Sequence, residues 1–110
     1  MKNPEVIVIG SGIGGLCCGG LLAKAGKKVL ILEAHSKPGG AAHSFEKNGY
    51  KFESGPSLWS GIGTWPTTNP LGQVLKALNQ KVELIKYKDW NVQIPEGEYT
   101  NGVGDTRFLD

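Results

Sequence analysis

The sequence has little excess charge, almost no cysteine and no long hydrophobic run, and each shortage argues against a class of protein. Twelve Lys and Arg stand against ten Asp and Glu, a net charge of +2. We expect no nucleic-acid partner, because nucleic acid requires a strongly basic face. The two cysteines, Cys17 and Cys18, are adjacent and cannot form an extracellular disulfide framework. No apolar stretch approaches the roughly 20 residues that span a bilayer, and the first residues contain no secretory h-region.

Side chains with obvious catalytic chemistry are also scarce. His35 and His43 have no Cys, His or carboxylate partner at metal-ligand spacing, so we expect no metal site. The sequence offers no Ser-His-Asp arrangement and no paired carboxylates, and we assign no catalytic residue within it. Cys17 and Cys18 are expected to be small, buried packing residues of a helix.

Glycine, in contrast, is abundant, with 17 residues in 110, about twice the usual share. The β-branched run at residues 6–9 predicts a strand buried on both faces of a parallel sheet. Residues 13–25 predict a helix, which Gly26 ends. Residues 29–32 predict a second apolar strand that delivers Glu33 at its tip. The fold class is therefore α/β, built on a Rossmann-like βαβ unit.

The first turn of this unit contains Gly-x-Gly-x-x-Gly. Gly10 permits a tight turn, Gly12 lets the backbone approach a pyrophosphate, and Gly15 allows helix and strand to pack closely. The helix N-terminus would present free N–H groups to that pyrophosphate. Glu33 could accept hydrogen bonds from both hydroxyls of an adenosine ribose and would repel a 2′-phosphate. The expected cofactor-binding residues of this part are Gly10, Ser11, Gly12, Ile13, Gly14, Gly15, Glu33 and Ala34.

This pattern continues into Pro38-Gly39-Gly40 and then into Gly49-Tyr50-Lys51-Phe52-Glu53-Ser54-Gly55-Pro56-Ser57. Together these motifs resemble the amino-terminal end of the FAD-dependent amine oxidase and phytoene desaturase superfamily. They are most similar to its carotenoid isomerase and retinol saturase branch. The family's arginine after the Gly-Gly pair is Ala41 here, which fits that branch better than the amine oxidases. The resemblance implies FAD as cofactor, with Gly39, Gly40, Gly55 and Pro56 as further contacts.

The resemblance also implies a function. We expect the cofactor-binding amino-terminal part of a FAD-dependent desaturase, isomerase or saturase that acts on a small hydrophobic polyene such as a carotenoid or retinoid. Catalytic residues would lie outside these 110 residues, which alone should be inactive and bind FAD weakly or not at all. Localisation is left open between the cytoplasm and the periphery of a membrane, and an apolar substrate would suggest peripheral membrane contact. The alternatives are a flavin amine oxidase and a non-catalytic nucleotide-binding remnant.

The remaining elements are predicted from local patterns. Residues 45–52 predict a hairpin with an Asn48-Gly49 turn, which places Phe45 opposite Phe52. Asn69-Pro70 predicts a helix start. Residues 82–87 predict a strand, and residues 90–94 predict a half-buried strand closed by a Pro-Glu-Gly turn. We expect residues 1–80 to be the FAD-binding region and residues 81–110 to begin a substrate domain.

Overall fold

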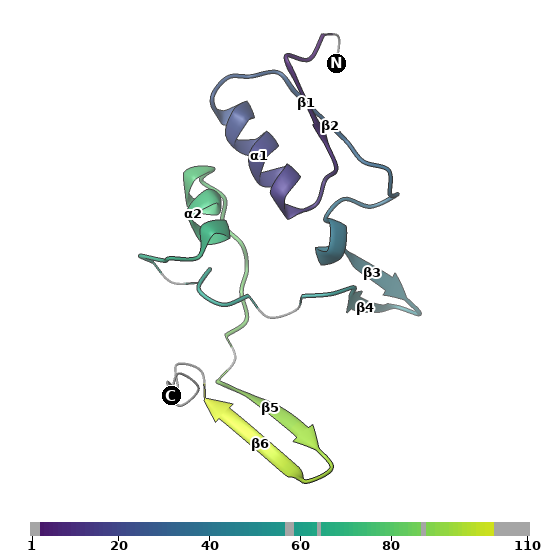
Figure 1. Ribbon diagram of the computed structural model, residues 1–110, viewed down its shortest axis with the longest axis vertical. Coiled ribbons are helices and arrows are strands. Elements are labelled where there is room, and N and C mark those ends of the chain that lie inside the picture. The colour runs from purple at the N-terminus through teal and green to yellow at the C-terminus, as the bar shows by residue number, and fades with distance from the viewer. Residues whose placement is uncertain (1–2, 57–58, 64, 87, 103–110) are drawn as a thin grey trace.

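The computed structural model describes residues 3–56, 59–63, 65–86 and 88–102 (Figure 1). Strand β1 (Val6–Ile9) pairs in parallel with β2 (Val29–Leu32), with Val6 opposite Val29 and Ile9 opposite Leu32. Helix α1 (Ile13–Lys24) connects the two strands and packs against them. The predicted βαβ unit is confirmed.

Glycines set how closely α1 approaches the sheet. A Cβ atom on Gly15 would overlap the carbonyl oxygen of Gly10, and one on Gly19 would lie 2.7 Å from Ile31 Cδ1. Helix α1 ends at Lys24, one residue before the predicted end, and Gly26 follows the cap residue with a φ of +85°, in the left-handed region. There the Gly26 N–H donates to the Ala23 carbonyl at 3.0 Å, which satisfies a terminal helix carbonyl. Small residues therefore fix both the position and the end of the helix.

The prediction that β1 is buried on both faces is wrong. Ile7 is 55% exposed and Ile9 is 88% exposed. Parallel strands are buried on both faces only when helices cover both, and α1 is the helix that packs on this pair. Within the described residues no hydrophobic side chain reaches full burial. The unit is therefore an incomplete, two-stranded Rossmann-like sheet whose apolar side chains are only partly covered.

A short 3-10 turn, η1 (Gly40–Ala42), leads into the hairpin of β3 (Ser44–Lys47) and β4 (Tyr50–Glu53). The predicted register is confirmed, since Phe45 pairs with Phe52 and their rings stack with centroids 5.3 Å apart. Asn48 and Gly49 both have positive φ, as a two-residue hairpin turn requires. The hairpin extends away from the βαβ unit (Figure 1).

Helix α2 (Pro70–Ala77) begins where the sequence predicts. The Asn69 side chain accepts hydrogen bonds from the backbone N–H groups of Leu71 at 2.9 Å and Gly72 at 3.2 Å. The helix lies beside α1 (Figure 1). Leu78, directly after α2, packs so closely on Gly20 of α1 that a Cβ there would lie 2.9 Å from Leu78 Cδ1.

The strand predicted at residues 82–87 does not form over residues 82–86, and Tyr87 lies outside the described residues. The prediction for residues 90–94 is confirmed by β5 (Asp89–Ile94), which pairs with β6 (Gly97–Gly102) across the Pro95-Glu96 turn. The sequence predicts that one face of β5, with Val92 and Ile94, is buried. This is wrong, because these two side chains remain exposed, at 38% and 41%. This second hairpin stands apart from the other elements (Figure 1).

Candidate functional site

Two glycine-rich segments meet at the N-terminus of α1. The backbone N–H of Gly39 donates to the Ser11 carbonyl at 2.8 Å, and Gly12 and Gly39 form an isolated parallel bridge. A Cβ atom on Gly40 would lie 3.0 Å from Gly12 Cα, so only glycine permits this approach without displacement. The structure therefore brings the predicted Gly39 and Gly40 directly against the predicted Gly10–Gly15 loop.

The first turn of α1 is suited to hold an anion. Its N-cap residue, Gly12, supplies no side-chain hydrogen bond, and the turn contains no acidic residue. The first amide to bond within the helix is that of Leu16, which donates to the Gly12 carbonyl at 2.9 Å. The preceding amides, those of Ile13, Gly14 and Gly15, have no partner inside the helix. The positive end of the helix dipole adds to their attraction for a phosphate.

Glu33 lies beside the same loop, at the end of β2. Its Oε2 atom accepts two hydrogen bonds from Ser11, one from the backbone N–H and one from the hydroxyl, both at 2.6 Å. Its Oε1 atom accepts from the backbone N–H of His35 at 2.8 Å. The Ser11 hydroxyl, followed by these backbone donors, lowers the Glu33 pKa from 4.5 to about 2. Glu33 is therefore a fixed, ionised and solvent-exposed acceptor next to the glycine loop.

The last two predicted cofactor residues, Gly55 and Pro56, follow β4. A Cβ atom on Gly55 would lie 2.5 Å from the Ala41 carbonyl oxygen, so this segment packs against η1. The backbone N–H of Ser54 donates to the His43 carbonyl at 3.1 Å, which holds the two segments side by side. Gly55 thus reaches the glycine loop indirectly, through η1.

One polar contact at this junction was missed by the sequence analysis. His43 Nδ1 lies 2.8 Å from the Gly40 carbonyl oxygen, and His43 Nε2 lies 2.8 Å from Ser54 Oγ. Because a carbonyl oxygen only accepts, Nδ1–H is the donor in the first of these contacts. The signal was present, because continuing the hairpin register two pairs beyond Phe45–Phe52 places His43 opposite Ser54.

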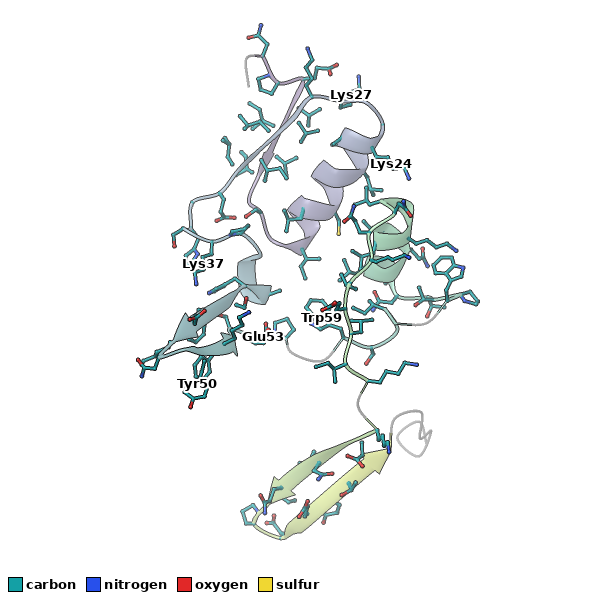
Figure 2. All side chains as sticks on the ribbon, turned by 180° about the vertical axis from the view of Figure 1, so that it is seen from behind. Lys24, Lys27, Lys37, Tyr50, Glu53 and Trp59 are labelled. Carbon is teal, nitrogen blue, oxygen red and sulfur yellow. The ribbon has the colours of Figure 1, made fainter. Side chains whose placement is uncertain are left out.

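Side chains around the junction are seen in Figure 2, which labels Lys37 and Glu53 near the two hairpin strands and Trp59 toward α2. Lys37 Nζ donates to the Ser44 carbonyl at 3.4 Å. Trp59 and Trp65 line two adjoining hollows, of 310 and 560 Å³, which share the lining residues Ile62, Leu75, Val82 and Leu84. Lys76 Nζ lies 3.3 Å from the Trp65 ring centroid. These aromatics therefore pack with α2, away from the glycine loop.

Cys17 is half-buried in α1 and Cys18 is exposed, so the expected burial of both is wrong for Cys18. Among the described residues, no group of three or more His, Cys, Asp or Glu side chains is arranged to hold a metal ion. No helix in the described part of the chain has the length and apolar character needed to cross a membrane.

Comparison with known proteins agrees with this geometry. The model of the NAD(P)-binding Rossmann-like domain matches residues 8–78. Human all-trans-retinol 13,14-reductase is 59% identical over 54 residues, which are 49% of this chain and 9% of that protein. Arabidopsis thaliana chloroplastic prolycopene isomerase is 42% identical over 81 residues, 74% of this chain and 14% of that protein. The chain thus spans a small part of the length of these relatives.

A solved structure supports the same architecture. An oxidoreductase from Methanosarcina mazei superposes with a TM-score of 0.68 and 25% identity, over 94% of this chain and 26% of that one. The likeness thus extends over nearly the whole of this chain and about a quarter of the other protein.

Proposed function

Because the chain belongs to the NAD(P)-binding Rossmann-like domain family, we propose that it forms the FAD-binding part of an oxidoreductase that acts on a hydrophobic polyene, such as a carotenoid or retinoid. The observation that carries the proposal is the meeting of Gly12 and Gly39 at the open N-terminus of α1. Glu33 stands beside this contact as an ionised acceptor. An anion site and a hydroxyl-binding carboxylate are the two features that an adenosine diphosphate group requires.

The residues present fit FAD. Gly12 and Gly40 face each other without side chains, since a Cβ on Gly40 would lie 3.0 Å from Gly12 Cα, and the lack of a side chain at Gly12 would let a pyrophosphate come close to the α1 amides. The proposed contacts of the ADP half are Gly10, Ser11, Gly12, Ile13, Gly14, Gly15, Glu33 and Ala34. Gly39 and Gly40 close over this half, and Gly55 and Pro56 extend the site along η1.

The charge on Glu33 favours FAD or NAD over NADP, because a 2′-phosphate on the ribose would face an ionised carboxylate. FAD is preferred to NAD on the resemblance of residues 38–57 to flavoproteins of the desaturase type. When bound, a flavin supplies hydride transfer, and the protein binds and orients it. The part assigned to this chain is to hold the nucleotide and exclude water from its phosphates.

The polyene is inferred from the names of the relatives. Retinol and prolycopene, which appear in the names of the human and Arabidopsis thaliana relatives, are both hydrophobic polyenes. We propose a substrate of this chemical class, received by parts of the protein beyond residue 80. A protein that exchanges such a substrate with lipid would be peripheral to a membrane, which flotation with liposomes would test.

The test uses the longest natural polypeptide that contains this chain. We expect the purified protein to carry one FAD per chain, identified by chromatography and mass after heat release. Under anaerobic conditions, retinoids or carotenoids should perturb the flavin spectrum, whereas amines should not. Release of NAD or of no nucleotide would contradict the cofactor assignment. Flavin reduction by amines would favour an amine oxidase, and bound flavin that responds to neither class would favour a non-catalytic role.

A further inference from the structure

Ser11 lies in the glycine loop but presents little of itself to a ligand. It is 4% exposed, the buried polar residue of the described chain. Its hydroxyl and its backbone N–H both donate to the same Glu33 oxygen, Oε2, at 2.6 Å. A hydroxyl has one proton to donate, so that of Ser11 is already used by Glu33. Ser11 therefore does not contact a nucleotide through its hydroxyl proton.

The arrangement instead controls the direction of the carboxylate. Glu33 is exposed and sits at the end of a strand, where an unsupported side chain would sample several rotamers. Two donors from one buried residue hold Oε2 toward the loop. A third hydrogen bond, from the backbone N–H of His35 to Oε1 at 2.8 Å, fixes the rotation of the carboxylate. Oε1 accepts one of these hydrogen bonds against two on Oε2, so it keeps more acceptor capacity for a further hydroxyl.

We infer that Ser11 is a positioning residue, which fixes Glu33 so that Oε1 receives a ribose hydroxyl of the cofactor. This inference rests on the proposed nucleotide site and adds to it the group that orients the acid. Ser11, which stands among the proposed ADP-binding residues, would thus act on the cofactor through Glu33.

The test compares a ligand that has the ribose hydroxyls with one that lacks them. The longest natural polypeptide containing this chain is freed of bound nucleotide and titrated with ADP and with 2′,3′-dideoxy-ADP by calorimetry. Three forms are compared: unmodified protein, Ser11→Ala, and Ser44→Ala as a matched control on β3. Ser44 is exposed, and its side chain has no hydrogen bond among the described residues.

We expect Ser11→Ala to weaken ADP binding by about three- to tenfold, the size of one hydrogen bond. Binding of dideoxy-ADP should change by less than about twofold, because that ligand makes no contact that Ser11 orients. Ser44→Ala should leave both affinities unchanged. Ser11→Cys keeps a side chain of similar size that donates only weakly, so its affinity for ADP should lie between those of the unmodified protein and Ser11→Ala. This variant replaces Ser11→Ala if the alanine variant folds poorly.

Three outcomes would overturn the inference. Equal losses for ADP and dideoxy-ADP would show that the Ser11 hydroxyl acts on the phosphate loop and not through Glu33. Unchanged or tighter ADP binding by Ser11→Ala would show that Ser11 does not orient Glu33 for the ligand; in both cases the proposed function would stand. Failure of the unmodified protein to bind ADP and FAD would remove the proposed function, and this inference with it.

Discussion

His43 and Ser54 are joined side chain to side chain, with Nε2 and Oγ 2.8 Å apart, where η1 and the end of β4 meet. The other imidazole nitrogen is 2.8 Å from the Gly40 carbonyl oxygen. One imidazole ring thus connects the turn that contacts Gly12 to the segment that contains Gly55. The position of that segment depends on a side chain that is not expected to touch the nucleotide.

Replacement of His43 by Ala should loosen this connection. The variant loses two hydrogen bonds in half-exposed surroundings, each contributing about 0.5–1 kcal/mol. The backbone amide of Ser54, which donates to the His43 carbonyl, should exchange hydrogen about five- to thirtyfold faster, while those of α1 should not change. Exchange measured by NMR or mass spectrometry checks this. Ser44→Ala, one residue along β3, is the control, and equal acceleration in it would contradict the role of the imidazole.

Gly15 should not tolerate a side chain, whereas its neighbour Gly14 should. A Cβ on Gly15 would overlap the Gly10 carbonyl oxygen, and both atoms belong to rigid backbone, whereas nothing lies within 4 Å of a Cβ on Gly14. Gly15→Ala should lower the free energy of unfolding by about 1–3 kcal/mol, and Gly14→Ala should keep or raise it. Denaturant unfolding of the two variants and of the unmodified protein measures these changes in the free energy of unfolding. Equal stability would mean that the loop moves freely away from α1.

The pH dependence of stability should carry a contribution from Glu33. Its pKa is lowered from 4.5 to about 2 by the Ser11 hydroxyl and the neighbouring backbone N–H groups. A depressed carboxyl pKa stabilises the folded state above the unfolded value, and the effect disappears as pH falls through the folded value. The free energy of unfolding of the unmodified protein should thus exceed that of Glu33→Gln by its full amount above pH 4.5, and this difference should disappear toward pH 2. A difference in the free energy of unfolding that stays constant between pH 4.5 and pH 2 would contradict this contribution of Glu33.

Reversal of charge at Glu33 should weaken FAD binding. Glu33→Lys replaces an acceptor of ribose hydroxyls with a donor and removes the partner of both Ser11 groups. We expect at least about a tenfold loss of FAD affinity, measured by flavin fluorescence on the longest natural polypeptide. Glu96→Lys, the same change in the exposed β5–β6 turn, is the control. Unchanged affinity in Glu33→Lys would sink the ribose assignment.

Local rules predicted much of this fold because short-range chemistry decides it. The Asn48-Gly49 turn fixes the hairpin register, since both residues accept positive φ and the pairs then follow by counting. Asn69 and Pro70 likewise determine where α2 begins. In the proposed site, the order of strand, glycine loop, helix and acid placed Glu33 correctly at the end of β2.

What failed depends on partners that a local pattern does not contain. The apolar residues at 82–86 match a strand, but no strand among the described residues pairs with them, and Ile85 is 97% exposed. The β-branched run that contains Ile7 and Ile9 predicted a strand buried on both faces, but both side chains are exposed, because α1 covers one face of the strand pair. The Ser11–Glu33 bonds join residues 22 positions apart, so their geometry emerged only with the fold.

The bridge between Gly12 and Gly39 has a consequence for the order in which the site is assembled. It closes a loop of 27 residues, and such a closure costs about 3 kcal/mol of chain entropy in a flexible-chain estimate. The α1 turns and the β3–β4 hairpin form from near neighbours, so they can precede it. A nucleotide held by both glycine segments would favour the closed loop, and its binding would then stabilise the folded chain. The fraction of molecules in which Gly12 and Gly39 are in contact would thus rise with the concentration of the nucleotide.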